Sequence, residues 1–106
     1  MYISYIFLLI DYLNSLYPDI EAREAKTNRQ LFNKRCVEQY IVNKITSKML
    51  DNPDYDPLDY IKDNINDYNY DISKCTSKKL LENYNIFIEV LNVMKIYLEE
   101  IMLWKD

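Results

Sequence analysis

The chain has 106 residues, a formal net charge of −4, no glycine and no histidine. This length fits a single domain of residues 1–106, and the apolar and aromatic content is high enough to fill a core. The lack of glycine disfavours hairpin-rich folds and phosphate-binding loops, and the lack of histidine disfavours acid/base catalysis and transition-metal binding.

The first predicted element is a core helix over residues 2–17. Its inward face is expected to carry residues at a helical spacing, namely Ile3, Ile6, Phe7, Ile10 and Leu13, and to be widened by Tyr2, Tyr5, Leu9 and Tyr12. The apolar run from Tyr5 to Ile10 is too short for a membrane span, and no basic region or cleavage site typical of a signal peptide accompanies it. We therefore expect a buried helix and no membrane attachment.

A second helical region is predicted between Asp19 and Leu50. Asp19 is a plausible N-cap after Pro18, whereas Asn28 could start a separate helix, so one helix and two helices remain alternatives. The residues expected to point inward are Leu31, Phe32, Cys36, Val37, Tyr40, Ile41, Ile45 and Met49.

A short third helix is predicted to begin at Pro57. Residues 51–53 form a helix breaker, and Asp56 followed by Pro57 is typical of an N-cap and a first helical residue. Its inward face is expected to carry Leu58, Ile61, Ile65 and Tyr68. The polar residues 69–77 are predicted to form a loop, in which Ser73, Thr76 or Ser77 caps the next helix.

The final helix is predicted over residues 76–104, and it is apolar around most of its circumference. Its length of about 43 Å exceeds the diameter of roughly 34 Å expected for a compact domain of this size. We therefore expect one end to reach a partner, and self-association as a homodimer through Tyr97, Ile101 and Trp104. Together the elements predict an all-α fold: a small antiparallel helical bundle of three long helices plus one short helix.

Charge is segregated along the chain. Residues 23–48 contain seven bases against two glutamates, and residues 51–71 contain seven aspartates against Lys62. The simplest interpretation is that these segments neutralise each other or are solvated. An alternative is a nucleic-acid-binding regulator that uses Arg29, Lys34 and Arg35 to contact phosphates, although the net acidity of the chain opposes it.

The aspartate-rich segment predicts a docking surface for a basic partner. Carboxylates would supply charge complementarity, and the interleaved tyrosines would supply contact area. The residues of this predicted surface are Asp54, Tyr55, Asp56, Asp59, Tyr60, Asp63 and Asp67. Usage rich in Ile, Asn, Tyr, Asp and Lys is typical of AT-rich genomes such as those of many viruses and phages. We therefore expect a cytoplasmic interaction protein of a virus, phage or mobile element that modulates or inhibits a host protein.

No enzyme, metal or cofactor signature is present. The sequence has no GxSxG motif and no Cys/His pair. A calcium loop beginning at Asp67 would have Ile72 where glycine is needed and Lys78 where glutamate is needed. Cys36 and Cys75 lack metal-ligand spacing and are expected to be buried free thiols, with a disulfide as the open alternative. We expect a protein without catalytic residues, a metal or a cofactor.

Overall fold

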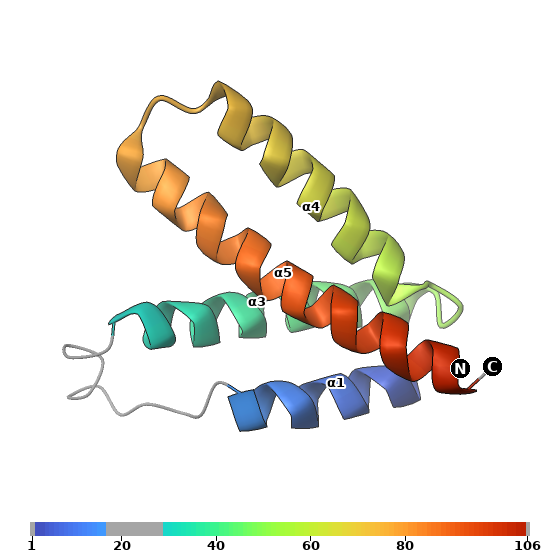
Figure 1. Ribbon diagram of the computed structural model, residues 1–106. Helices are drawn as coiled ribbons and strands as arrows, with labels where there is room; N and C mark the ends of the chain where they lie inside the picture. The colour runs from blue at the N-terminus through green and yellow to red at the C-terminus, as the bar shows by residue number, and fades with distance from the viewer. Residues whose placement is uncertain (1, 17–28, 106) are drawn as a thin grey trace.

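The computed structural model describes residues 2–16 and 29–105, with side chains for residues 2–16 and 33–103. Within these ranges the protein is all-helical and contains no strand. The helices are α1 (Ile3–Leu16), α3 (Arg29–Asp51), α4 (Pro57–Lys74) and α5 (Lys78–Lys105). They pack against one another, with α4 and α5 side by side and α5 crossing α1 and α3 (Figure 1).

Helix α5 is the central element, because it contacts α1, α3 and α4. The prediction of one unbroken closing helix is confirmed, and its 28 residues span about 42 Å. This length matches the longest dimension of the molecule, 40 Å. Val90, Leu91, Met94 and Leu98 are fully buried at its middle. The wide apolar arc of α5 is thus used by three neighbouring helices.

The buried side chains of the described residues form one hydrophobic cluster drawn from all four helices. Its members from the other helices are Ile6, Leu9, Leu13, Ile41, Val42, Ile45, Met49, Leu58 and Ile61. Burying each large aliphatic side chain contributes about 1.5–3 kcal/mol, so this cluster is the main source of stability.

An aromatic junction joins α3, α4 and α5 beside the core. The ring of Phe87 lies edge-on to Tyr40, with centroids 5.9 Å apart, and 5.1 Å from the ring of Tyr68. Tyr68 also contacts Tyr84, at 5.6 Å. Such pairs add about 0.5–1.5 kcal/mol each beyond their burial, so the junction fixes how α3 meets the other two helices.

The predicted inward face of α1 is partly wrong. Phe7 is 64% exposed and Ile3 is also exposed, whereas Leu9 is completely buried. Helix α1 is apolar on several faces, so its own pattern does not fix its rotation. The packing of α1 against α3 and α5 selects the line through Ile6, Leu9 and Leu13 instead.

The predicted inward face of α3 also needs correction. Ile41, Ile45 and Met49 are buried as expected, but Cys36 is exposed and Tyr40 is about half exposed. Val42 and Glu38 are buried in their place. Both cysteines are free thiols in the structure, and Cys75 is partly buried. The choice between one helix and two before residue 29 falls on residues 17–28, outside the described residues.

Helix α4 has 18 residues and is longer than α1, which has 14, so the prediction of a short third helix is wrong. Residues 69–74 were predicted as loop because they are polar. They continue the helix, since neither glycine nor proline interrupts it after Pro57. The helix ends where the N–H of Cys75 donates to the carbonyl oxygen of Ile72, and the Ser77 hydroxyl then accepts from the N–H of Leu80 to cap α5.

Candidate functional site

The predicted acidic surface begins in the turn between α3 and α4. The Asn52 side-chain oxygen accepts from the N–H of Asp54 at 3.1 Å, and the N–H of Tyr55 donates to the Asn52 carbonyl oxygen at 2.9 Å. Asp56 then caps α4, since its carboxylate accepts from the N–H of Leu58 at 2.9 Å, and Pro57 occupies the first turn. This hydrogen bonding holds the start of the surface in one conformation.

Four carboxylates follow one another along the outer side of α4. Asp59, Asp63, Asp67 and Asp71 are spaced by four residues and all are exposed. Residues four apart lie on neighbouring turns of one helix face, so these four form a row of about 18 Å, named here the acidic stripe. Asp71 was assigned to a loop by the sequence prediction, and it joins the stripe because α4 continues to Lys74.

The aspartates of the acidic stripe form no ion pair with a neighbouring base in the described part of the chain. Lys62, the lysine inside the same segment, lies 3.7 Å from Glu99 on α5 instead. No ion pair within the described ranges involves Asp59, Asp63, Asp67 or Asp71. The described residues contain no ion pair between α3 and α4. Ion pairing between these helices therefore does not neutralise the basic and acidic segments, as one interpretation of the sequence expected.

The two tyrosines of the predicted surface pack against the core and are only partly exposed. Burial raises the pKa of Tyr55, and the nearby carboxylates of Asp59, Asp63 and Asp56 raise it further. The ammonium of Lys48 lies 5.6 Å above the Tyr55 ring. Tyr55 therefore sits within the negative field of the surface and links it to α3.

Tyr60 belongs to the packing between helices more than to the surface. Burial raises the pKa of Tyr60 to about 12, with smaller contributions from Tyr40, Tyr68 and Tyr55. Its hydroxyl is thus neutral at physiological pH. The exposed ring beside the acidic stripe is Tyr70, whose face lies 5.8 Å from the Lys74 ammonium. Tyr70 lies three residues after Asp67, and helical spacing alone identifies this neighbour.

Two of the three bases named for nucleic-acid binding, Lys34 and Arg35, are paired with other side chains of the fold. Lys34 pairs with Glu89 on α5 at 2.7 Å. Arg35 donates to Glu38 at 3.1 Å and to the side-chain oxygen of Asn14 on α1 at 2.6 Å. The Arg29 side chain lies outside the described residues.

Glu38 is the residue that the sequence analysis missed. It is buried, with 3% of its surface exposed, and it lies in the row formed by Ile41, Ile45 and Met49. Buried carboxylates need a charged partner, and Arg35 one turn earlier supplies it. A glutamate at a core-facing position with arginine three residues before it is the signal that identifies this pair.

The residues named for self-association have different surroundings. The Tyr97 ring stacks on Tyr12 of α1, and Ile101 packs partly buried against the core. The Trp104 side chain lies outside the described residues. Ile96 and Leu103 are the large apolar side chains that α5 leaves most exposed in its described part.

Two general findings concern metals and membranes. Within residues 2–16 and 29–105, no three carboxylates or thiols converge where they could hold a metal ion. None of the helices described combines the length and apolarity needed to cross a bilayer.

Comparison with protein families, curated proteins and solved structures gives no match to this chain.

Proposed function

We propose that this protein is a non-catalytic interaction module that binds another protein by its basic surface, through the acidic stripe and the adjoining turn. The observation that carries the proposal is the row of four exposed aspartates on one helix, unpaired within the described chain. Complementary charge across an interface speeds encounter and selects the partner. Binding would modulate or inhibit the protein that supplies the basic surface.

The energetic cost of the stripe supports this proposal. Like charges four residues apart on a helix destabilise it by about 0.2–0.5 kcal/mol per pair. The stripe contains three such neighbouring pairs, formed by Asp59, Asp63, Asp67 and Asp71. Lys62 is close in sequence but lies against Glu99. A basic partner would relieve this repulsion, so the free energy that the repulsion costs in the isolated protein would add to the free energy of binding.

The remaining parts of the proposal concern the scaffold and its setting. The short connection of residues 75–77 between α4 and α5 supports a small antiparallel bundle. The exposed Ile96 and Leu103 support a homodimer formed along α5, together with the predicted Tyr97, Ile101 and Trp104. The composition supports a virus, phage or mobile element as the source. For a protein from such a source, the proposed target is a host protein in the cytoplasm.

The alternative function is a nucleic-acid-binding regulator acting through Arg29, Lys34 and Arg35. It would require Lys34 to leave Glu89 and Arg35 to leave Glu38 and Asn14. The second rearrangement would break the ion pair of a buried carboxylate, which is costly. We therefore favour the protein-binding function.

The test compares affinity capture by three forms of the full chain. The first is the natural sequence and the second carries Asp63→Asn, Asp67→Asn and Asp71→Asn, which spares the cap residue and the first turn of α4. The third is a matched control with the same change in charge on other exposed positions: Asp11→Asn, Glu82→Gln and Glu100→Gln. Captured proteins are identified by mass spectrometry, and their binding is measured with purified components at increasing salt.

We expect proteins with basic surfaces to be retained by the natural chain and the control but lost with the stripe variant. Their affinity should fall as salt rises, because exposed charges are screened. Equal capture by all three forms would contradict the proposal. Salt-dependent retention of DNA or RNA that is lost in an Arg29→Gln, Lys34→Gln variant would favour the alternative.

A further inference from the structure

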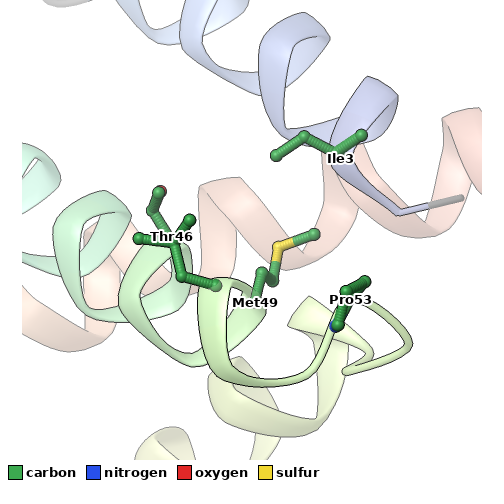
Figure 2. A pocket seen from close by; sticks show the side chains of 5 residues that line it. Ile3, Thr46, Met49 and Pro53 are labelled. Atoms are coloured by element: carbon green, nitrogen blue, oxygen red, sulfur yellow. The ribbon is translucent and has the colours of Figure 1, made fainter.

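An apolar pocket of about 210 Å³ opens beside the turn that begins the acidic surface. Its walls come from the first turn of α1, the end of α3 and the turn before α4. The lining residues are Ile3, Thr46, Met49, Leu50 and Pro53. Figure 2 shows the labelled side chains of Ile3, Thr46, Met49 and Pro53 around a shared space. The pocket therefore depends on the packing of α1 against α3.

The one polar side chain of the pocket already uses its hydrogen-bond donor within the fold. The Thr46 hydroxyl donates to the carbonyl oxygen of Val42 at 2.7 Å, so it has no second hydrogen to offer to a ligand. The other lining side chains are aliphatic, thioether or proline. A polar ligand would lose hydrogen bonds to water and find few partners on these walls, so the pocket favours an apolar occupant.

The size of the pocket fits a single side chain. A cavity of about 150 Å³ holds a benzene molecule, whereas sites for drug-sized ligands and cofactors are about 300–1,000 Å³. A pocket of about 210 Å³ therefore suits one leucine, methionine or phenylalanine side chain. Leu50 at its edge is 80% exposed, so the fold leaves most of this side chain uncovered.

Two residues that line the pocket, Leu50 and Pro53, are each followed directly along the chain by an aspartate. Asp51 follows Leu50 and Asp54 follows Pro53, and both are exposed. Neither carboxylate takes part in an ion pair within the described ranges. The nearest base along α3 is Lys48, which lies about 160° around the helix from Thr46 and Leu50 and sits over the Tyr55 ring. An apolar pocket flanked by carboxylates is complementary to an apolar side chain flanked by bases.

We propose that this pocket receives an apolar side chain from a basic segment of the partner protein, while lysine or arginine residues of that segment pair with Asp51 and Asp54. This inference rests on the proposed function and specifies the chemistry of the partner. Apolar anchors in small pockets carry much of the affinity of protein interfaces, and surrounding charges select the partner. The partner segment is thus basic and amphipathic.

The test uses three synthetic helical peptides as probes of the full, isotope-labelled chain, followed by NMR. The first places leucines on one helix face and lysines on the other. The second replaces its leucines with serine, and the third replaces its lysines with glutamate. The protein variants are Leu50→Ser, which removes an exposed wall of the pocket, and Leu80→Ser, a matched control at the exposed start of α5.

We expect the lysine/leucine peptide to shift the amide signals of Ile3, Thr46, Leu50 and Asp54. Its dissociation constant should rise about tenfold or more with Leu50→Ser, and likewise when serine replaces the peptide leucines. Leu80→Ser should leave it unchanged. The glutamate peptide should not bind.

The outcomes separate this inference from the proposed function. If leucine and serine peptides bind equally and shift only signals of α4, the pocket takes no anchor while the acidic stripe still binds bases. If no lysine peptide binds anywhere, both proposals fail. If the glutamate/leucine peptide binds as well as the lysine/leucine peptide, the occupant of the pocket need not be basic. If sedimentation shows a dimer that Leu50→Ser abolishes, the occupant is a second copy of the chain. Either result would overturn the inference that a basic segment of a partner fills the pocket.

Discussion

The rings of Tyr12 and Tyr97 stack with their centroids 4.2 Å apart and their planes 5° from parallel. Tyr12 lies on α1 and Tyr97 on α5, so the stack ties the first helix of the chain to the last. Tyr97 was predicted as a self-association residue because it continues an apolar row on α5. Its stack inside one chain makes it part of the scaffold, whatever a second copy contacts.

A double-mutant cycle on this stack measures its contribution. We expect Tyr12→Leu and Tyr97→Leu to be coupled by about 0.5–1.5 kcal/mol in the free energy of unfolding, because aromatic pairs add this much beyond burial. Denaturant unfolding of the two single variants and the double variant provides the measurement. Strictly additive effects would show that the rings contribute by burial alone.

Replacing Glu38 should destabilise the protein, because the Arg35 guanidinium loses the carboxylate with which it forms an ion pair. Glu38→Ala removes the carboxylate that pairs with Arg35 at 3.1 Å, and breaking a buried pair costs about 3–5 kcal/mol. We expect about 3 kcal/mol, since Arg35 keeps its hydrogen bond to Asn14. Chemical denaturation gives the value, with the exposed Glu100→Ala as a control expected within about 0.5 kcal/mol of the natural chain.

The pair itself is expected to contribute little net stability. A double variant with Arg35→Met and Glu38→Leu should unfold within about 1 kcal/mol of the natural chain, because apolar residues of similar volume replace a buried pair at low cost. A single Glu38→Ala variant as stable as the Glu100→Ala control would contradict the buried-pair account.

Loss of the α4 cap should lower thermal stability. Asp56→Ala removes the carboxylate that accepts from the N–H of Leu58, a change that costs about 1 kcal/mol and lowers the melting temperature by about 4–8 °C. Asp54→Ala in the same turn is the control, since its side chain makes no capping bond in the described structure. Identical melting temperatures for the two variants would show that Asp56 does not cap.

Alkaline pH should unfold the protein partly through Tyr60. Its hydroxyl ionises near a pKa of 10.0 in the unfolded chain, whereas the folded protein holds that pKa at about 12. Between these values the unfolded state binds fewer protons, so stability falls as pH rises through this window and is intact below it. Burial also raises the pKa of Tyr68, which adds to the effect.

The variant Tyr60→Phe tests this pH dependence. It lacks the ionisable hydroxyl, so its alkaline unfolding, followed by circular dichroism, should shift to higher pH. Tyr70→Phe, which alters an exposed ring, should leave the transition in place. A transition that does not move with Tyr60→Phe would assign alkaline unfolding to other groups.

Neutralising the middle of the acidic stripe should stabilise the isolated protein. Asp63→Asn removes the like-charge pairs with Asp59 and Asp67, and we expect a gain of about 0.4–1 kcal/mol at low salt. The gain should shrink as salt rises, because these charges are exposed. Asp11→Asn on α1 is the charge-matched control. A destabilised Asp63→Asn variant would show that the stripe has an internal role.

The sequence predicted those parts of the fold that depend on local chemistry. The cap at Asp56, Pro57 in the first turn of α4 and the unbroken α5 follow from residue types at fixed spacing. The rotations of α1 and α3 do not, because both helices have more apolar residues than one face can hold. Neighbouring helices decide that Leu9 is buried and Phe7 exposed.

The candidate site was predictable in its charge but not in its details. Asp59, Asp63 and Asp67 follow from helical spacing, whereas Asp71 was missed because a polar stretch was taken for the end of a helix. The packing of Tyr60 between helices depends on Tyr40, which comes from α3 and cannot be read from the pattern of α4 itself. The apolar pocket unites residues from positions 3 to 53, and such long-range neighbours are absent from any local pattern.

The turns between α3, α4 and α5 have a consequence for the unfolded state. No described residue has a positive φ angle, so these turns never need the left-handed conformation that glycine adopts most easily. Every residue there restricts the backbone even before folding, and ordering it costs less entropy. The stiffness of the denatured chain thus stabilises the native state, and replacing an exposed residue of these turns with glycine would weaken the protein by giving the unfolded chain more freedom.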